Sequence, residues 1–270
     1  MFDPSPDRVA VMGVLNVTPD SFSDGGRFGN DADAIAGAVS MFEAGADIID
    51  VGGESTRPGA ESVTVEVELQ RTLGVITALT ELGIPTSIDT SKPEVAATCV
   101  SAGACFVNDV TGFRNPEMRA MVVASNVGVC IMHMQGAPRT MQQNPEYDDV
   151  VADVKSFLQR QAAMLMESGL DHARIWIDPG IGFGKTLEHN LSLLKHTRDF
   201  VNTGINVLVG VSRKSFIAKV SDSATPAERL PGSLSASLYA VMGGAKMVRT
   251  HDVRETVQAL QVWQAIQNML

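Results

Sequence analysis

The sequence lacks the features that mark nucleic-acid-binding and membrane-spanning proteins. Its 270 residues contain 21 lysines and arginines against 31 aspartates and glutamates, a formal net charge of −10, and no run of basic residues. An acidic chain without a basic patch is not expected to bind nucleic acid. No apolar stretch approaches the roughly 20 residues that cross a bilayer, and residues 1–8 do not have the pattern of a secretion signal. We therefore expect neither a nucleic-acid partner nor a membrane association.

Cysteine is also scarce, which excludes a disulfide framework and a cysteine-rich metal site. Cys99, Cys105 and Cys130 are an odd number, lack the spacing of metal ligands, and stand beside apolar or small residues. We expect buried, reduced thiols. Together with the absence of a targeting segment, this predicts a cytoplasmic protein.

Short apolar runs recur along the chain, and segments of helical periodicity or composition separate them. Such β-α alternation is typical of parallel sheets. Eight units without a repeat or linker predict an α/β protein, a single-domain (β/α)8 TIM barrel over residues 1–270, with extended loops at its active-site face. The runs lie at 9–15, 48–51, 85–88, 105–107, 127–132, 175–177, 207–211 and 247–248.

Two helices carry start signals that the sequence makes explicit. A segment with apolar side chains at helical spacing begins with Asp148 and Asp149, where the helix dipole favours acidic groups. The last segment begins with Asp252 and Glu255 at the spacing of a capping box. We expect a helix after each of these starts.

Polar side chains follow the apolar runs. In a parallel barrel the carboxyl ends of the strands share one face, so these side chains should converge on one site. Any single Asp or Asn could instead cap the following helix, but their recurrence at all eight ends favours a common site. The residues are Asn16, the turn at 52–57, Asp89, Asn108 with Asp109, His133, Asp178, Ser212 with Arg213 and Lys214, and Arg249 with His251.

The stretch 175–185 is the most distinctive of these ends. Its strand finishes at Asp178, and a glycine-rich loop follows, in which Phe183 offers an aromatic face for a planar heterocycle. A phosphate-binding P-loop would need Gly in place of Pro179, and a dinucleotide fingerprint would need Gly in place of Lys185. The alternative is a tight turn in which the aspartate caps the next helix.

Two groups of polar residues suggest two kinds of ligand. Asp89, Asn108 and Asp178 could accept the adjacent N–H donors of a guanidine-like ring edge, and Lys214 could donate to a ring carbonyl or nitrogen unless it is an ordinary solvated lysine.

Arg249, His251 and Asn16 form the second group and suit a pyrophosphate, with Asn16 also able to bind a divalent cation. A salt bridge for Arg249 and a helix-terminus contact for His251 are the alternatives. His133 stands between Met132 and Met134, and we expect a hydrogen-bonded structural histidine there. Two glycine-flanked loops, 16–26 and 54–59, are predicted to act as lids.

These motifs, in this order, resemble those of the dihydropteroate synthases, which are pterin-binding enzymes. The resemblance covers essentially the whole chain and shows no departure at a position that the family uses. Its motifs lie at 13–26, 53–59, 87–90, 108–109, 132–136, 178–185, 212–216 and 249–252.

The resemblance implies a homodimeric transferase of folate biosynthesis and a target of sulfonamides. It would condense 6-hydroxymethyl-7,8-dihydropterin pyrophosphate with 4-aminobenzoate, with Mg²⁺ assisting. Carried over residue by residue, the implied catalytic set is Asp24, Asp89, Lys214, Arg249 and His251. The implied pterin site is Asp89, Asn108, Asp178, Phe183 and Lys214, the pyrophosphate site is Asn16, Arg249 and His251, the 4-aminobenzoate site is Phe22, Thr56, Arg57, Pro58 and Ser215, and the metal ligand is Asn16.

The chemistry that the resemblance implies needs no protein nucleophile, which agrees with the lack of a Ser-His-Asp or Cys-His arrangement. Two alternatives remain: the methyltetrahydrofolate-binding domain of methyltransferases and a non-catalytic pterin-binding paralogue. The first has no need of a pyrophosphate site and the second is expected to lose one, whereas this chain retains Asn16, Arg249 and His251.

Overall fold

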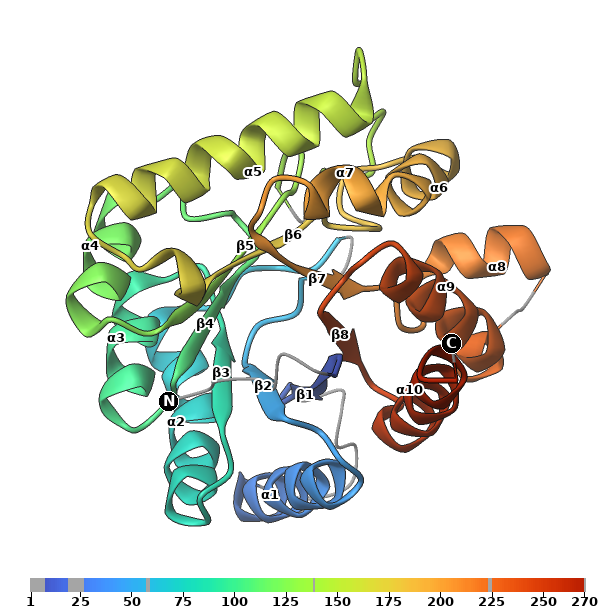
Figure 1. The fold of residues 1–270 in the computed structure, drawn as a ribbon. Helices are drawn as coiled ribbons and strands as arrows, with labels where there is room; N and C mark the ends of the chain where they lie inside the picture. Colours follow the sequence, from blue (N-terminus) through green and yellow to red (C-terminus); the bar gives the residue numbers. More distant parts are fainter. Residues whose placement is uncertain (1–7, 19–26, 57–58, 138, 223–224, 270) are drawn as a thin grey trace.

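Eight parallel strands close into a barrel in the computed structural model, which describes residues 8–18, 27–56, 59–137, 139–222 and 225–269. Each strand pairs with the next along the chain, and β8 pairs with β1 (Figure 1). This confirms the predicted barrel and all eight predicted strands. Their bounds are β1 Ala10–Asn16, β2 Ile48–Gly52, β3 Thr86–Asp89, β4 Phe106–Asp109, β5 Gly128–Met132, β6 Ile175–Asp178, β7 Asn206–Gly210 and β8 Met247–Thr250.

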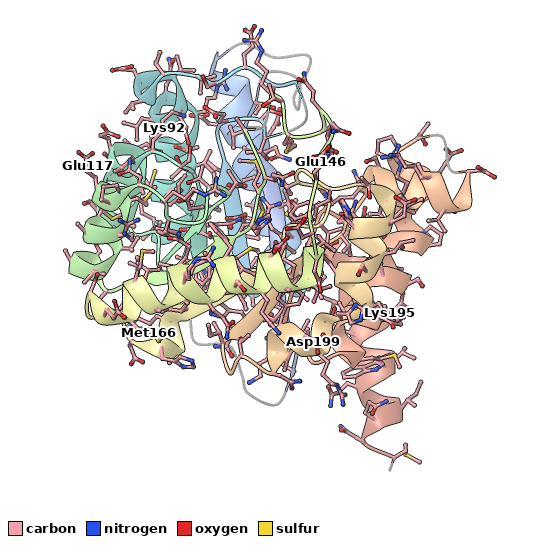
Figure 2. All side chains as sticks on the ribbon, turned by 90° about the horizontal axis from the view of Figure 1, so that it is seen from above. Lys92, Glu117, Glu146, Met166, Lys195 and Asp199 are labelled. Atoms are coloured by element: carbon pink, nitrogen blue, oxygen red, sulfur yellow. The ribbon has the colours of Figure 1, made fainter. Side chains whose placement is uncertain are left out.

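Helices lie outside the ring of strands, and side chains fill the space between the two layers (Figures 1 and 2). Most strands are followed by one helix, but β6 and β7 are each followed by two. The helices are α1 Arg27–Glu43, α2 Val65–Glu81, α3 Pro93–Ser101, α4 Pro116–Ser125, α5 Val150–Glu167, α6 Leu187–Lys195, α7 Thr197–Val201, α8 Ser215–Ser221, α9 Leu230–Met242 and α10 Val253–Gln267. None of the helices within the described ranges has the length and apolarity to cross a membrane.

The two helix starts singled out from the sequence behave differently. Asp149 caps α5, because its Oδ1 accepts hydrogen bonds from the N–H groups of Val151 at 3.0 Å and Ala152 at 3.1 Å. The capping box expected at Asp252 is wrong. Asp252 precedes α10 without capping it, since its carboxylate accepts two hydrogen bonds from Arg213, at 3.0 and 2.5 Å. A bidentate guanidinium is a stronger partner than one backbone N–H.

Alternation along the strands places an apolar floor inside the barrel and a polar layer directly above it. Residues that point outward, such as Ile49 and Ile88, pack beneath the helices. Residues that point inward near the strand starts, such as Phe106 and Trp176, form a separate apolar cluster. Two residues further along, the side chains point inward again because a strand has a period of two, and there they are polar. The pairs are Ile48 and Asp50, Phe106 and Asn108, Trp176 and Asp178, and Met247 and Arg249.

The three cysteines lie in the barrel and its helical layer as thiols. Cys99 and Cys130 are buried and Cys105 is half-buried. Cys130 belongs to the apolar floor, and burial raises its pKa well above the ordinary value, so it stays protonated. All three are free thiols, and the prediction that they are buried is confirmed for Cys99 and Cys130 and wrong for Cys105.

Candidate active site

The guanidinium of Arg249, on β8, lies at the centre of the polar layer. Its Nε donates to Oδ2 of Asp50 at 2.6 Å, and its Nη2 donates to Oδ2 of Asp89 at 2.8 Å. The amide of Asn108 donates to the same oxygen of Asp50 at 2.9 Å. These contacts join the ends of β8, β2, β3 and β4. The salt bridge considered for Arg249 from the sequence is therefore present.

Burial and mutual repulsion shape the charges of this group. Burial, together with the negative charge of Asp50, raises the pKa of Asp89 to about 7, and the positive charge of Arg249 opposes both effects. Burial alone would lower the pKa of Arg249, but the two carboxylates hold it above its ordinary value. The Oδ1 atoms of Asp50 and Asp89 are buried and have no hydrogen-bond partner among the described residues. Buried acceptors of this kind suit a ligand with N–H donors.

Asp178, at the end of β6, forms a second acidic position across the mouth of the barrel. Its Oδ1 accepts a hydrogen bond from the N–H of Gly180 at 2.7 Å, which shapes the tight turn expected there. Burial raises its pKa, and the positive charge of Lys214 partly offsets this. The idea that Asp178 caps the next helix is wrong, because Thr186 caps α6 in a capping box with His189.

Lys214 extends over the glycine-rich loop that follows Asp178. Its ammonium donates to the carbonyl oxygen of Ile181 and lies 4.4 Å from the centroid of the Phe183 ring. Burial lowers the pKa of Lys214 to about 8, although Asp178 opposes the shift. Contact with an aromatic face and an enclosed carbonyl distinguishes Lys214 from an ordinary solvated lysine.

Two glycines allow this loop to pack closely against its neighbours. A Cβ at Gly180 would lie 1.9 Å from the carbonyl oxygen of His133, and a Cβ at Gly182 would lie 3.1 Å from Cδ of Lys214. Both glycines have positive φ, +69° and +85°, which favours glycine. The loop can therefore pack against the exit of β5 on one side and carry the lysine stem on the other.

Lys185 supports the same loop from below. Its buried ammonium donates to the carbonyl oxygens of His133 at 3.3 Å and Phe183 at 3.0 Å, and lies 3.1 Å from Nδ1 of His133. Burial and the charge of Lys185 lower the pKa of His133 to about 2, so the imidazole is neutral. His133 is thus a hydrogen-bonded structural histidine, as expected. The sequence does not predict this supporting role of Lys185.

His251 follows Arg249 at the exit of β8, and Asn16 ends the neighbouring strand β1. The hydroxyl oxygen of Ser212 accepts the backbone N–H of His251 at 3.2 Å and lies 3.1 Å from its Nδ1. The hydroxyl proton can then point to Nδ1, which places the proton of a neutral ring on Nε2. Asn16 and Asp89 lie on either side of Gly52, because a Cβ built there would be 3.7 Å from Oδ1 of Asn16 and 3.8 Å from Oδ2 of Asp89.

The structure describes two of the five residues predicted to bind 4-aminobenzoate, Thr56 and Ser215. Thr56 is half-buried in the loop after β2, and Ser215 is exposed at the start of α8. Phe22, Asp24, Arg57 and Pro58 lie outside the described residues. Within the ranges that the structure describes, no three His, Cys, Asp or Glu side chains form a group that could hold a metal ion.

Asp50 is the site residue that sequence reasoning missed. It lies inside the run Ile48 to Val51, which was interpreted only as a buried strand. An acidic residue inside an apolar run could have indicated this role, because a carboxylate in the middle of a fully buried strand is unfavourable unless it is paired. Asp50 is indeed completely buried, and its partners come from β4 and β8.

The chain matches the family model described as Pterin binding enzyme over residues 12–251. It is 47% identical over 256 residues to the dihydropteroate synthase of Escherichia coli K12, covering 94% of this chain and 90% of the relative. The Synechocystis enzyme of that name is 44% identical, covering 96% and 90%.

Solved structures agree with these relatives. Dihydropteroate synthase of Xanthomonas albilineans with 4-aminobenzoic acid superposes with a TM-score of 0.91 at 46% identity, covering 97% of this chain and 94% of the other. The same enzyme in complex with 7,8-dihydropteroate gives 0.89 at 43% identity, covering 98% and 95%. The Yersinia pestis enzyme in a sulfonamide drug complex gives 0.92 at 40% identity, covering 99% and 97%.

The close contact at Gly180 predicts a specific loss of stability. Gly180→Ala should lower the free energy of unfolding by about 2–4 kcal/mol, the sum of a clash with backbone and the cost of a positive φ. Gly204→Ala is the matched control, because Gly204 also has positive φ but nothing within 4 Å of its added Cβ, and it should lose only about 1 kcal/mol. Urea denaturation measures both. Equal losses would contradict the packing described for this loop.

Proposed function

The chain belongs to the pterin binding enzyme family, and we propose that it acts as a dihydropteroate synthase. It joins the methylene carbon of 6-hydroxymethyl-7,8-dihydropterin pyrophosphate to the amino nitrogen of 4-aminobenzoate, forming 7,8-dihydropteroate for folate biosynthesis. The observation that carries this conclusion is 47% identity over 94% of the chain to an enzyme of that name.

The acidic groups of the site suit the pterin ring. Asp89, Asn108, Asp178 and Lys214 hold its polar edges, and Phe183 lines the pocket. The unpartnered Oδ1 of Asp89 and the buried carboxylate of Asp178 support this assignment, because carboxylates accept the adjacent N–H groups of a guanidine-like edge. Lys214 would donate a hydrogen bond to a ring carbonyl or nitrogen.

The basic groups suit the pyrophosphate. Arg249 and His251 bind its oxygens, with Asn16 beside them. Arg249 is held by Asp50 and Asp89 in a fixed orientation, which supports binding without rearrangement. A guanidinium that stays charged and an imidazole N–H are both donors to an anion.

The reaction is a dissociative displacement at the pterin methylene. The bond between this carbon and the pyrophosphate oxygen breaks, the electron-rich ring stabilises the cation that forms, and the amino nitrogen of 4-aminobenzoate then bonds to the carbon and loses a proton. Asp89 and Asp178 stabilise the cation, and Arg249 with His251 stabilises the charge on the departing pyrophosphate. Asp24 is proposed to help organise the closed site.

A magnesium ion fits the oxygen donors of this region. Mg²⁺ usually retains water and binds one or two carboxylates together with substrate phosphates, and we propose that the amide oxygen of Asn16 is a protein ligand to it. When bound, it would stabilise the negative charge of the leaving group. Omitting Mg²⁺ from the assay should abolish turnover, and undiminished activity in chelator would contradict its role.

The 4-aminobenzoate lies between the β2–α2 loop and the start of α8. Phe22, Thr56, Arg57, Pro58 and Ser215 are proposed to surround it. Sulfonamides resemble this substrate, and we propose that they compete at the same position. Inhibition that 4-aminobenzoate does not relieve would contradict a shared site.

Large apolar side chains on the outer helices support a homodimer. Tyr239 and Met242 on α9 are 52% and 62% exposed, and Val262 and Ile266 on the adjacent α10 are 58% and 60% exposed. Exposed large apolar side chains on two helices that contact each other are compatible with an interface. A monomer mass in sedimentation would contradict this.

The three thiols support a reducing, cytoplasmic location, which cell fractionation tests.

Pyrophosphate release tests the function directly. The purified protein receives pterin pyrophosphate, 4-aminobenzoate and Mg²⁺, with controls that omit each component. Release that needs both substrates, with dihydropteroate as the product, establishes the synthase. Pterin binding without release would instead indicate a non-catalytic binding protein.

Asp178→Asn should weaken pterin binding by about a hundredfold or more. The amide group turns an N–H donor toward the N–H donors of the pterin, so the two charge-assisted hydrogen bonds to the carboxylate are lost. The amide oxygen can still accept the N–H of Gly180, so the turn is retained. Calorimetry with a free pterin measures the affinity. An unchanged affinity would remove Asp178 from the pterin site.

His251→Ala should weaken pterin pyrophosphate about tenfold, the effect of losing one hydrogen bond to a charged group, and leave free pterin unaffected. The two titrations are compared by calorimetry on the same preparation. Equal losses for both ligands would contradict the assignment to the anion.

The pH dependence follows from Asp89 and Lys214. The carboxylate of Asp89 must be ionised to accept the ring donors, and its pKa is raised to about 7, so kcat/KM for pterin pyrophosphate should rise through that pH. Lys214 must be protonated, and its pKa is lowered to about 8, so kcat/KM should fall above that pH. Lys214→Arg should remove the alkaline decline, because a guanidinium stays charged. A flat profile in the wild type, or an alkaline decline that persists in Lys214→Arg, would contradict these roles.

A further inference from the structure

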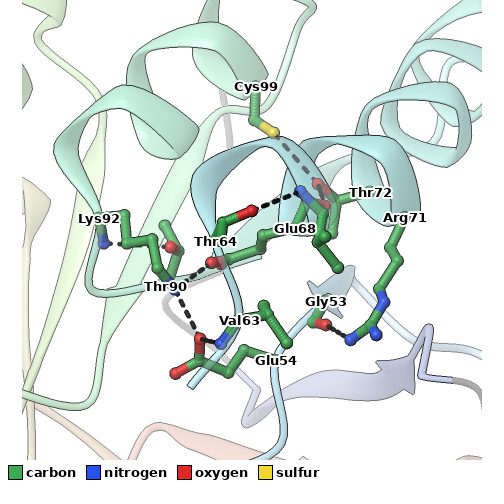
Figure 3. A network of polar contacts seen from close by, with 11 residues as sticks. Gly53, Glu54, Val63, Thr64, Glu68, Arg71, Thr72, Thr90, Lys92 and Cys99 are labelled. Carbon is green, nitrogen blue, oxygen red and sulfur yellow. Dashed lines mark hydrogen bonds and ion pairs between the residues drawn. The ribbon is translucent and has the colours of Figure 1, made fainter.

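The β2–α2 loop is tied at its base by one lysine (Figure 3). Lys92 lies just before α3, and its Nζ donates to Oε2 of Glu54 at 2.6 Å and to Oε2 of Glu68 at 2.5 Å. Glu54 belongs to the loop, whereas Glu68 belongs to α2. One ammonium from the β3–α3 connection thus joins the start of the loop to the helix that follows it.

Further contacts close the loop upon itself. The N–H of Val63, near the end of the loop, donates to Oε2 of Glu54 at 2.9 Å, the same oxygen that Lys92 binds. Arg71 donates to the carbonyl oxygen of Gly53 at 2.7 Å. A Cβ at Gly53 would lie 2.7 Å from Cγ2 of Thr72, so the backbone there rests directly on α2. Both ends of the segment that contains Thr56 are therefore fixed.

Lys92 supplies the positive charge that balances the carboxylates of Glu54 and Glu68. Burial alone would lower its pKa, but hydrogen bonds and attraction from Glu54 and Glu68 raise it above the ordinary value, so it stays an ammonium. Glu68 is completely buried, and its Oε1 has no hydrogen-bond partner in the described ranges. Without Lys92, two enclosed carboxylates would lie together uncompensated, which is strongly unfavourable.

We propose that Lys92 is a positioning residue that fixes the β2–α2 loop, and with it the 4-aminobenzoate side of the active site. This inference rests on the proposed function, in which Thr56 contacts that substrate. Lys92 follows Asp89 by three positions, so one strand end supplies both a pterin ligand and the anchor of the second substrate's loop. A small displacement of a substrate-binding group is enough to reduce the rate of the reaction.

Steady-state kinetics on four proteins test this inference. Lys92→Met removes the charge and keeps the shape of the stem, and Lys92→Arg keeps a cation that can bind two carboxylates. Lys195→Met is the matched control, because Lys195 is exposed at the end of α6 and lies across the molecule from Lys92 (Figure 2). KM is measured separately for 4-aminobenzoate and for pterin pyrophosphate, together with kcat, the melting temperature and the affinity for free pterin.

We expect Lys92→Met to raise KM for 4-aminobenzoate about tenfold or more, the effect of losing a charge-assisted contact. KM for pterin pyrophosphate and the affinity for free pterin should change less than about twofold, Lys92→Arg should recover most of the loss, and Lys195→Met should match the wild type. Two results would overturn the inference: equal increases in both KM values, or a lower melting temperature with no change in KM for 4-aminobenzoate. If Lys92→Met does not fold, Glu54→Gln supplies the same comparison at the other end of the contact.

The wild-type protein separates this inference from the proposed function in the same assay. If it forms no dihydropteroate, the proposed function fails. If it forms dihydropteroate and KM for 4-aminobenzoate is insensitive to Lys92→Met, only the role of Lys92 fails.

Discussion

The sharing of one guanidinium by two buried carboxylates is the interaction on which the site depends. Arg249 binds Asp50 and Asp89 at 2.6 and 2.8 Å, and Asn108 binds Asp50 from a fourth strand. Charges inside a barrel are unfavourable unless they are paired and hydrogen-bonded, so the ends of β2, β3, β4 and β8 must be held in one register. The apolar floor that contains Trp176 makes this possible, because it fills the barrel beneath the charges.

The balance of charge at the mouth fits the reaction. Asp50, Asp89 and Asp178 line the pterin side of the site, and the nearby cations are Arg249, Lys214 and Lys185. We propose that Asp89 and Asp178 stabilise a positive charge that develops on the pterin. Burial raises the pKa values of Asp89 and Asp178, and repulsion from Asp50 adds to the shift of Asp89, so both acids gain from a cationic ligand. We propose that the guanidinium of Arg249 binds the departing pyrophosphate and so stabilises negative charge. Catalysis here consists of positioning and fixed charges rather than covalent chemistry.

The sequence predicted the barrel and the polar strand ends because both follow from local patterns: apolar runs of strand length, and polar residues after them. It did not predict Asp50, whose role depends on Arg249, 199 positions away. The capping box at Asp252 failed for the same reason, since Arg213 from another connection takes the carboxylate. The pairing of Lys92 with two glutamates likewise joins three separate elements. Contacts between distant positions decide which of several local roles a polar side chain adopts. Such contacts cannot be predicted from the residues of one local segment.

We propose that Asp50 and Arg249 act as one unit in binding pterin pyrophosphate. A double-mutant cycle on kcat/KM for that substrate, with Asp50→Asn, Arg249→Lys and the pair, measures their coupling. We expect strong non-additivity, with a coupling free energy of at least about 1 kcal/mol, because either change alone already disrupts the shared geometry. Additive losses would show that the two residues act independently, and would contradict an active site organised around this ion pair.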